Sequence, residues 1–437
     1  MSSDPWAVRA ATVAEQVGGT YGHRLAGLPG TWIGRIDLPG ARPRPPWGEW
    51  NYWWQAQFVD CLVDAARREW HLASEPPSAP PRWLSLAQRV IRTIRLRNFG
   101  RFENLFFDDM AWLALAASRA ERLSREIGSA GLPPAARAAE VLGRRLVSGD
   151  TLDLGGGMFW NTKRQYKNTA ATGPAALCFA RSDDPRARRR AQALVDWLFE
   201  NLLDPSSGLF LDGIDLRRDK SGYLTTTVNH DVWTYNQGPI LGALLELGGD
   251  PGTEPGASNL ERAGRLIEAI AAGLTTAGLT TAGASDGGAS GGDTWAGDGG
   301  ASGSRALRSD GDGGDHGLFR GILARYLALA AVSPQLPAHA RQTAKALVLA
   351  TAEEVWAREA SVPETGGRRE TAGRRETGGR RETAGRRETA SPATQLSSRL
   401  QAWMVLEAAA VAAEAAPPAE PGGAPDAEDE TEGASGR

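Results

Sequence analysis

Lysine is scarce in this 437-residue chain, and arginine supplies nearly all of its basic side chains. The four lysines are Lys163, Lys167, Lys220 and Lys345. Lysine and arginine together number 49 against 52 aspartates and glutamates, for a formal net charge of -3. Because there is no basic excess, the chain lacks the broad positive surface that binds nucleic acid, and we expect no nucleic-acid partner.

Cysteine and histidine are also few, at 2 and 5 residues. The histidines show none of the close spacings, with one another or with carboxylates, that metal sites use, so we predict no metal site. Cys61 and Cys178 each lie in an apolar helical pattern, where a buried, reduced thiol is the usual state. A disulfide is therefore not expected.

Long apolar runs are missing too. No stretch of about 18 apolar residues occurs, and the first residues, MSSDPWAVRAATVAEQ, do not place an apolar segment after a basic one. We therefore expect neither a membrane partner nor a secretion signal in this sequence, and we expect a cytoplasmic location.

The chain instead carries helical periodicity from one end to the other. Apolar residues recur at spacings of three and four, while the alternation typical of strands is nearly absent, and this pattern predicts about twelve helices. Their expected ranges are 5–17, 51–72, 83–97, 108–126, 133–147, 167–181, 186–203, 234–247, 258–273, 316–332, 337–357 and 395–414. Prolines that follow aspartates, as at Pro5 and Pro185, mark helix starts.

Connections between these helices alternate in length. Those after even-numbered helices are mostly short, such as 127–132 and 182–185, whereas those after odd-numbered helices are mostly long, such as 148–166 and 204–233. Even-numbered helices are apolar almost all round, and odd-numbered ones keep a charged face. We therefore predict an all-α (α/α)6 barrel of six inner and six outer helices, with the long loops on one functional face. A helical solenoid would need a repeat of fixed period, which we do not find.

Two low-complexity segments interrupt this order. One, at about 275–314, is rich in Gly, Ala, Ser and Asp, and the other, at about 358–393, contains the array GGRRETAGRRETGGRRETAGRRETA. Neither can bury a core, so we interpret both as insertions in a single domain that spans 1–414. Residues 415–437 are acidic and rich in Pro, Gly and Ala, and we expect a disordered tail.

Polar and aromatic residues gather at the starts of the expected inner helices and in the loops before them. The blocks are NYWWQAQ (51–57), FFDDMAW (106–112), LGGGMFWNTKRQYKNTAATGPAAL (154–177), GLFLDGI (208–214), TYNQGPI (234–240) and DHGLFRGILARYLA (315–328). Flat aromatic rings suit the C–H face of a pyranose, while amides, carboxylates and arginine suit its hydroxyls. The blocks therefore predict a carbohydrate site at one mouth of the barrel.

Asp108 and Asp109 stand side by side within an apolar and aromatic block. The structural interpretation is a helix start, where free N–H groups and the helix dipole stabilise carboxylates. The chemical interpretation is catalysis, because consecutive residues pointing about 100° apart can bring two carboxyl groups to roughly 5–6 Å, the separation that retaining glycoside hydrolysis uses. Repulsion and partial burial then keep one group protonated beside an ionised partner.

Taken together, FFDDMAW, the GGGMFW and YKNTAATGPAAL segments, GLFLDGI, TYNQG and GLFRGILARYL resemble glycoside hydrolase family 76, the endo-α-1,6-mannanases and their relatives. The resemblance covers about residues 48–330 and the last helix. It implies an (α/α)6 barrel and a retaining double displacement on α-1,6-linked mannose, with no metal or organic cofactor. Met110 and Thr172 depart from the family pattern, so we expect that subsite preference can differ.

The resemblance also implies roles for individual residues. Asp108 is the expected nucleophile and Asp109 the expected general acid/base, acting on α-mannan or a mannooligosaccharide. The predicted substrate-binding residues are Trp54, Trp160, Asn168, Asp212, Tyr235, Asn236 and Gln237. Their structural interpretation is helix capping or core packing, and the adjacent Trp53 and Trp54 cannot both face the cavity centre. We expect a monomer.

Three other functions stay open at this point. Transglycosylation uses the same fold and passes the sugar to another sugar. A sugar 2-epimerase on a similar barrel needs histidine general bases, and His230 and His316 lie near the expected functional face. A mannan-binding protein without catalysis would keep the aromatic residues, but it would not need both aspartates.

Overall fold

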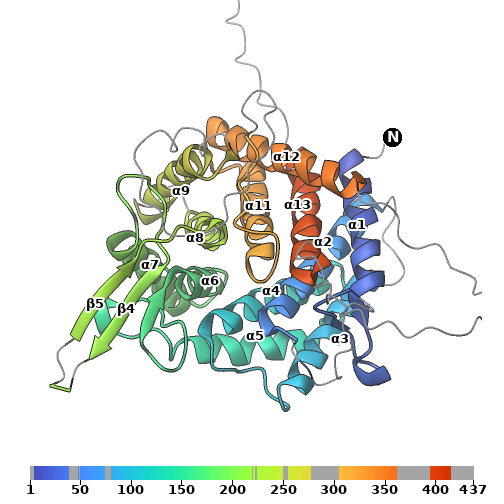
Figure 1. Cartoon of the computed structure of the whole chain (residues 1–437), viewed down its shortest axis with the longest axis horizontal. Coiled ribbons are helices and arrows are strands. Elements are labelled where there is room, and N and C mark those ends of the chain that lie inside the picture. The colour runs from blue at the N-terminus through green and yellow to red at the C-terminus, as the bar shows by residue number, and fades with distance from the viewer. Residues whose placement is uncertain are drawn as a thin grey trace, which may run out of the picture.

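The chain forms a two-layered ring of helices, seen in Figure 1. The structure is a computed structural model, and it describes residues 4–38, 48, 50–73, 80–218, 220–221, 224–249, 254–276, 305–361 and 394–414. Over these ranges, none of the helices combines the length and the apolar character that crossing a lipid bilayer requires. The predicted all-α fold is confirmed.

Inner and outer helices alternate along the chain. The inner helices are α2 (Tyr52–Leu72), α4 (Phe107–Glu126), α6 (Thr169–Ala180), α8 (Thr234–Leu247), α11 (His316–Val332) and α13 (Leu396–Ala413). The outer helices are α1 (Pro5–Tyr21), α3 (Arg82–Arg97), α5 (Pro133–Leu146), α7 (Pro185–Asn201), α9 (Glu254–Gly273) and α12 (Ala338–Ser361). Each inner helix packs against the next, and α13 packs against α2, which closes the ring. All twelve predicted helices are confirmed.

Burial explains which helices lie inside. In α6, whose sequence is TAATGPAALCFA, every residue except Cys178 is buried, and its small side chains allow neighbouring helices to approach closely. In α7 only one stripe is buried, and Arg186 and Arg189 stay exposed on the other side. Burying apolar surface stabilises by about 25 cal/mol per Å², so helices that are apolar all round are held from every side. The starts of the inner helices are thereby fixed in space.

Helix starts follow the capping rules used for their prediction. Asp4 accepts a hydrogen bond from the backbone N–H of Trp6 at 3.1 Å, and Asp184 accepts one from Arg186 at 2.9 Å. A proline then takes the first helical position in both α1 and α7, where a missing N–H costs no hydrogen bond.

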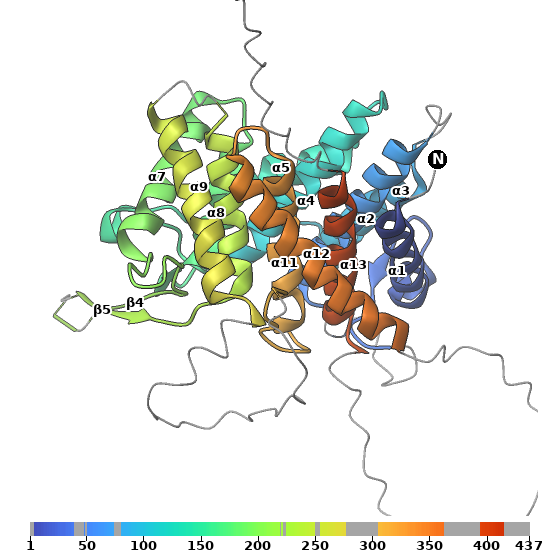
Figure 2. The same cartoon turned by 90° about the horizontal axis from the view of Figure 1, so that it is seen from above.

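Short strands, which the sequence did not predict, are also present among the described residues. They are β1 (Gly22–His23), β2 (Ile33–Gly34), β3 (Tyr166–Asn168), β4 (Gly213–Arg218) and β5 (Leu224–Asn229). β3, β4 and β5 form one antiparallel sheet, and the β4–β5 hairpin projects from the ring in Figures 1 and 2. The expected helix start at residue 167 is wrong, because residues 166–168 pair with β4 before α6 begins.

Most of both predicted insertions, and the whole predicted tail, lie outside the described residues. The end of the first segment, residues 305–314, is described. Ala306 and Leu307 are fully buried there, and the backbone N–H of Leu307 donates to Thr351 of α12 at 2.9 Å. Part of a segment that composition marks as unable to bury a core therefore packs against the barrel.

Candidate active site

A pocket of about 560 Å³ lies where the N-terminal ends of five inner helices, α2, α4, α6, α8 and α11, meet. The helices contribute Trp53, Asp108, Asp109, Tyr235 and Phe319, among others. β3 and the connecting loops contribute Trp160, Tyr166, Asn168, Asp212 and Asp315. The pocket therefore lies at the face to which the long connections lead, and its lining is mainly aromatic side chains, carboxylates and an amide.

The first turn of α4 is anchored on both sides of the aspartate pair. Phe107 and Met110 are buried in the core, so the two residues between them, Asp108 and Asp109, are turned to the pocket. The backbone N–H of Phe107 donates to the carbonyl of Trp160 at 2.8 Å. The free N–H groups of this turn, together with the helix dipole, favour negative charge at the position of the pair.

Asp108 has donors that favour its ionised form. Its Oδ2 accepts a hydrogen bond from the indole N–H of Trp160 at 3.0 Å, and its buried Oδ1 has no hydrogen-bond partner within the described ranges. Burial raises the pKa of Asp108 to about 7, and the charge of Asp315 adds to the rise. Backbone N–H groups of the helix start and the Trp160 indole oppose it.

Asp109 has fewer donors than Asp108. Its Oδ2 accepts a hydrogen bond from the side-chain amide of Asn104 at 2.6 Å. Burial, and then the charge of Asp108, raise the pKa of Asp109 well above its usual range, while Asn104 opposes the rise. Because Asp108 has the backbone and Trp160 donors and Asp109 faces the Asp108 charge, we assign the shared proton to Asp109.

Asp212, just before β4, collects donors from three elements. Its Oδ2 accepts from the hydroxyl of Tyr166 in β3 at 2.5 Å and from Asn229 in β5 at 3.3 Å. Its Oδ1 accepts from Asn236 in α8 at 3.1 Å. Burial raises the pKa of Asp212 above its usual value, and these donors oppose the rise without cancelling it. Asp212 therefore ties the small sheet to the wall of the pocket.

A cluster of aromatic rings forms another part of the wall. Tyr235 stacks on Phe319, with ring centroids 4.0 Å apart and planes 22° apart. Trp53 lies tilted against both rings, with centroids 6.3 Å away. Burial raises the pKa of Tyr235 well above its usual range, and the charges of Asp212 and Asp108 add to the rise. The phenol therefore stays neutral beside the carboxylates and offers both a flat face and a hydroxyl.

Lys167 supports the loop that carries Trp160. It lies in β3 between two pocket residues, and since side chains alternate along a strand, it points away from the pocket and is fully buried. Its ammonium donates to the backbone carbonyls of Thr151 at 3.0 Å, Asp153 at 2.6 Å and Gly156. Burial lowers the pKa of Lys167 to about 8. These three hydrogen bonds fix residues 151–156, which lead into the loop that carries Trp160.

The sequence model of the family described as "Glycosyl hydrolase family 76" matches residues 6–415. The chain belongs to glycosyl hydrolase family 76. The resemblance noted in the sequence is confirmed, and the protein is a glycoside hydrolase. No curated protein sequence matches this family 76 chain.

Solved structures resemble the chain over nearly its whole length. An α-1,6-mannanase of Salegentibacter sp. HEL1_6 has a TM-score of 0.65 and 26% identity, covering 93% of this chain and 99% of that chain. An inactive variant of that enzyme has two consecutive aspartates replaced by asparagine and is in complex with α-1,6-mannotriose; it has a TM-score of 0.65 and 25% identity, with 93% and 99% covered. A Listeria innocua protein, with a TM-score of 0.63, 22% identity and 93% and 97% covered, shows the shared fold.

Most of the predicted site residues of this family 76 chain come together in the pocket. They are Asp108, Asp109, Trp160, Asn168, Asp212 and Tyr235. Asn168 also caps α6, because its side chain accepts the backbone N–H of Ala171 at 3.1 Å. The capping interpretation and the pocket interpretation of Asn168 therefore both apply.

Trp54, Asn236 and Gln237, which the sequence predicted as sugar contacts, do not line the pocket. Trp54 is 2% exposed and packs in the core, while the preceding residue on α2, about 100° away around the helix, lines the pocket instead. The amide of Gln237 is used by the backbone of Phe210 and by the carbonyl of Trp233. Asn236 supports Asp212 as described above. All three side chains are buried behind the pocket-lining residues and pack against or hydrogen-bond to neighbouring chain segments.

The prediction omitted Tyr166, Asp315 and Phe319, although each lies within or beside a block that it recognised. Recognising β3 would have placed Tyr166 on the same face as Asn168, two residues on. Asp315 accepts the indole N–H groups of Trp53 at 2.9 Å and Trp54 at 2.7 Å, so it joins α2 to the start of α11. Asp315 directly follows a low-complexity segment, and its composition gave no sign of a pocket residue there.

Histidine and cysteine have minor places in this enzyme. Among the described side chains, no group of three or more His, Cys, Asp or Glu could hold a metal ion. His316 lines the pocket and stacks on Trp233 with centroids 5.1 Å apart, whereas His230 does not line it. Cys61 and Cys178 are free, and burial raises the pKa of both thiols.

Proposed function

We propose that the enzyme cleaves α-1,6-linked mannose in α-mannan or mannooligosaccharides by a retaining double displacement. The observation that carries this proposal is the adjacent pair Asp108 and Asp109, partly buried in one pocket, with environments that separate their protonation states. The inactive Salegentibacter variants, which lack two consecutive aspartates, support it by analogy. Their complexes with α-1,6-mannooligosaccharides support the choice of substrate.

In the first step, the ionised carboxylate of Asp108 attacks the anomeric carbon of the sugar. The bond from that carbon to the glycosidic oxygen breaks as Asp109 transfers its proton to the oxygen. The products of this step are a sugar covalently bound to Asp108 and a shortened chain that leaves with a new hydroxyl. Asp109 is then ionised, and it no longer faces a negative charge on Asp108.

In the second step, Asp109 acts as a base. It takes a proton from a water molecule as the water oxygen attacks the anomeric carbon, and the bond to Asp108 breaks. The carboxylate of Asp108 and the proton on Asp109 are thereby restored. Two inversions at the anomeric carbon leave its configuration unchanged, so the initial product is the α anomer.

The remaining pocket residues suit the recognition of a pyranose. The stacked Tyr235 and Phe319 rings and the adjacent Trp53 offer apolar faces. Asp212 and Asn168 offer acceptor and donor groups for hydroxyls. A sugar can contact the apolar faces and also hydrogen-bond to the polar groups. An apolar ligand would leave the polar groups without hydrogen-bond partners.

The deciding experiment incubates the purified protein with α-1,6-mannotetraose and follows the products by proton NMR and mass spectrometry. We expect shorter oligosaccharides that appear first as the α anomer. First release of the β anomer would contradict the double displacement. Longer products would indicate transglycosylation. Conversion of mannose to glucose would indicate a 2-epimerase. Binding without any turnover would indicate a carbohydrate-binding protein.

A further inference from the structure

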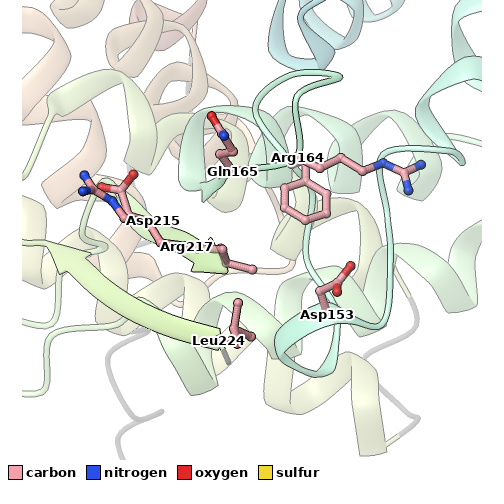
Figure 3. Close-up of a pocket in the computed structure, with 8 residues that line it drawn as sticks. Asp153, Arg164, Gln165, Asp215, Arg217 and Leu224 are labelled. Carbon is pink, nitrogen blue, oxygen red and sulfur yellow. The ribbon is translucent and has the colours of Figure 1, made fainter. Parts of the chain in front are cut away.

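Figure 3 shows a second pocket, of about 740 Å³. It shares a stretch of chain with the proposed catalytic pocket. Phe159 and Gln165 line the second pocket, whereas the residues that follow them, Trp160 and Tyr166, line the first. The two pairs lie in the arms of a tight return of the chain, with its turn at 161–164 and Trp160 hydrogen-bonded to Tyr166 across the arms. Each arm is extended, and successive side chains of an extended chain point to opposite faces. Residues 159–166 are therefore a wall shared by the two pockets.

The charged groups of the second pocket balance. Arg164 and Arg217 bring two positive charges, and Asp153 and Asp215 bring two negative ones. The Arg164 side chain extends away from Arg217 in Figure 3, and its guanidinium donates to the carbonyl of Ser148 at 3.3 Å, so its charge lies at the edge of the pocket. In Figure 3, Asp215 and Arg217 lie across the cavity from Asp153. An anionic ligand would meet the carboxylates and a cationic ligand the guanidinium groups, so the balance favours a neutral ligand. A neutral ligand that uses both donors and acceptors is rich in hydroxyl groups.

The side chains that can bind are accessible. Gln165 and Arg217 are exposed, and neither side chain makes a hydrogen bond with another residue in the ranges that the structure describes. Leu224, which is half-buried, adds apolar surface to the lining, and Phe159 and Leu216 are buried beneath it. The volume lies within the range of about 300–1,000 Å³ that small-ligand sites occupy. Planar polar groups with an apolar base suit a sugar ring.

We propose that this second pocket is an accessory glycan site, which binds mannose units of the polymeric substrate that are not being cleaved. This inference rests on the function proposed above. It adds that long chains bind on both sides of the shared wall, while a short oligosaccharide fills the catalytic pocket alone. The accessory site therefore increases the preference of the enzyme for polymer over short fragments, with no part in the chemical step.

The test compares two substrates in the full-length enzyme. The Gln165→Ala, Arg217→Ala double variant removes the two exposed side chains, and Arg92→Ala, an exposed arginine of outer helix α3, is the matched control. We expect kcat/KM on α-1,6-mannan to fall about fivefold or more, the effect of one or two lost hydrogen bonds. On α-1,6-mannotetraose we expect no change, and the control should match the wild type on both substrates.

Each other result has a distinct meaning. An unchanged kcat/KM on mannan overturns the accessory site, and so does an equal fall on both substrates, because that would show an effect through the catalytic pocket. Binding can also be measured in the Asp108→Asn, Asp109→Asn background. There, adding the Gln165→Ala, Arg217→Ala substitutions should weaken the binding of mannan and leave the binding of α-1,6-mannotetraose unchanged. If the wild type neither binds nor cleaves either substrate, the proposed function fails, and the accessory site fails with it.

Discussion

Buried and partly buried carboxylates lie toward both ends of the ring of inner helices, but their partners differ. In the central part of α2, Asp60 and Asp64 form ion pairs with Arg119 of α4 and Arg325 of α11. At the N-terminal end of α4, Asp108 and its neighbour accept hydrogen bonds from an indole and an amide. No arginine or lysine of the described ranges lies within ion-pair distance of that pair.

The difference in partners reverses the electrostatics. Burial raises the pKa of Asp64, but the guanidinium groups of Arg119 and Arg325 outweigh it, and the pKa is lowered overall. For Asp108 and Asp109 burial is not offset, and the pKa is raised. Burial alone therefore does not make a carboxylate reactive. The pair that we propose as catalytic is the one for which the fold provides neutral donors and no cation.

The largest effect should come from removing either member of the unpaired pair. We expect Asp108→Asn and Asp109→Asn each to lower kcat on α-1,6-mannotetraose by about 10²–10⁴-fold or more, since each variant lacks a group that acts in the chemical step. Product release followed by mass spectrometry measures this. Asp183→Asn, at an exposed connection, is the control and should keep full activity. Activity above a tenth of wild type in either variant contradicts the proposed roles.

At the paired end the effect should be on stability. Arg325→Met leaves Asp60 and Asp64 with one fewer cation, and we expect a loss of about 3–5 kcal/mol in the free energy of unfolding. Urea denaturation measures this, with the exposed Arg265→Ala as the control. Should Arg325→Met not fold, Arg325→Lys keeps the charge and should lie between it and wild type. An unchanged midpoint would show that the ion pairs are dispensable.

Trp160→Phe should have a smaller effect, and one that depends on pH. The variant keeps the ring but removes the N–H that favours ionised Asp108, so the pKa of Asp108 rises. Activity needs this group ionised, so the acid limb of the kcat/KM profile should move to higher pH. At pH 6 we expect a fall of about tenfold, the effect of one hydrogen bond to a charged group. Trp233→Phe, in the same pocket, should leave the limb in place.

The smallest effect should distinguish the two ends by sign. The folded-state pKa of Asp109 is raised above 3.8, so its charge costs stability at higher pH, and Asp109→Asn should raise the melting temperature at pH 8. The pKa of Asp64 is lowered from 3.8, so its charge contributes stability there, and Asp64→Asn should lower the melting temperature. The Asp109 difference should shrink as the pH falls toward 4, whereas the Asp64 difference should persist to about pH 4 and shrink only below 3.8. Shifts of the same sign at pH 8 would contradict the comparison.

The helices and their layers could be predicted because burial imposes a period on the sequence. The strands could not, since β5 reads LTTTVN with its middle residues exposed, and no apolar alternation marks it. Their pairing was set by contacts with β3 and β4, which are distant in sequence. Long-range pairing of this kind leaves little local signal.

Site residues in the loops and at the helix starts could be predicted from their chemistry. Residues within a helix were harder to predict, because the exact start of the helix decides which side chain faces the pocket. Trp53 and Trp54 could not be separated, because a start at Tyr52 fixes which one turns inward and its exact position is not visible in sequence. Gln237 has the right chemistry for sugar, but the backbone of Phe210 uses it. The carboxyl separation, the cytoplasmic location and the monomeric state stay predictions.

The scarcity of lysine has a practical consequence for attaching the enzyme to a surface. Lys167 is enclosed by backbone carbonyls, so amine-reactive reagents should not reach it. Lys163 lies exposed in the wall between the two pockets, and Lys220 lies exposed between β4 and β5. Lys345 is half-buried on α12 and donates to the carbonyl of Ala413 at the C-terminal end of α13. Coupling through the two exposed amines would therefore tether the enzyme by the face that its proposed substrate enters. Immobilised enzyme should lose access to long glycans before it loses access to short ones.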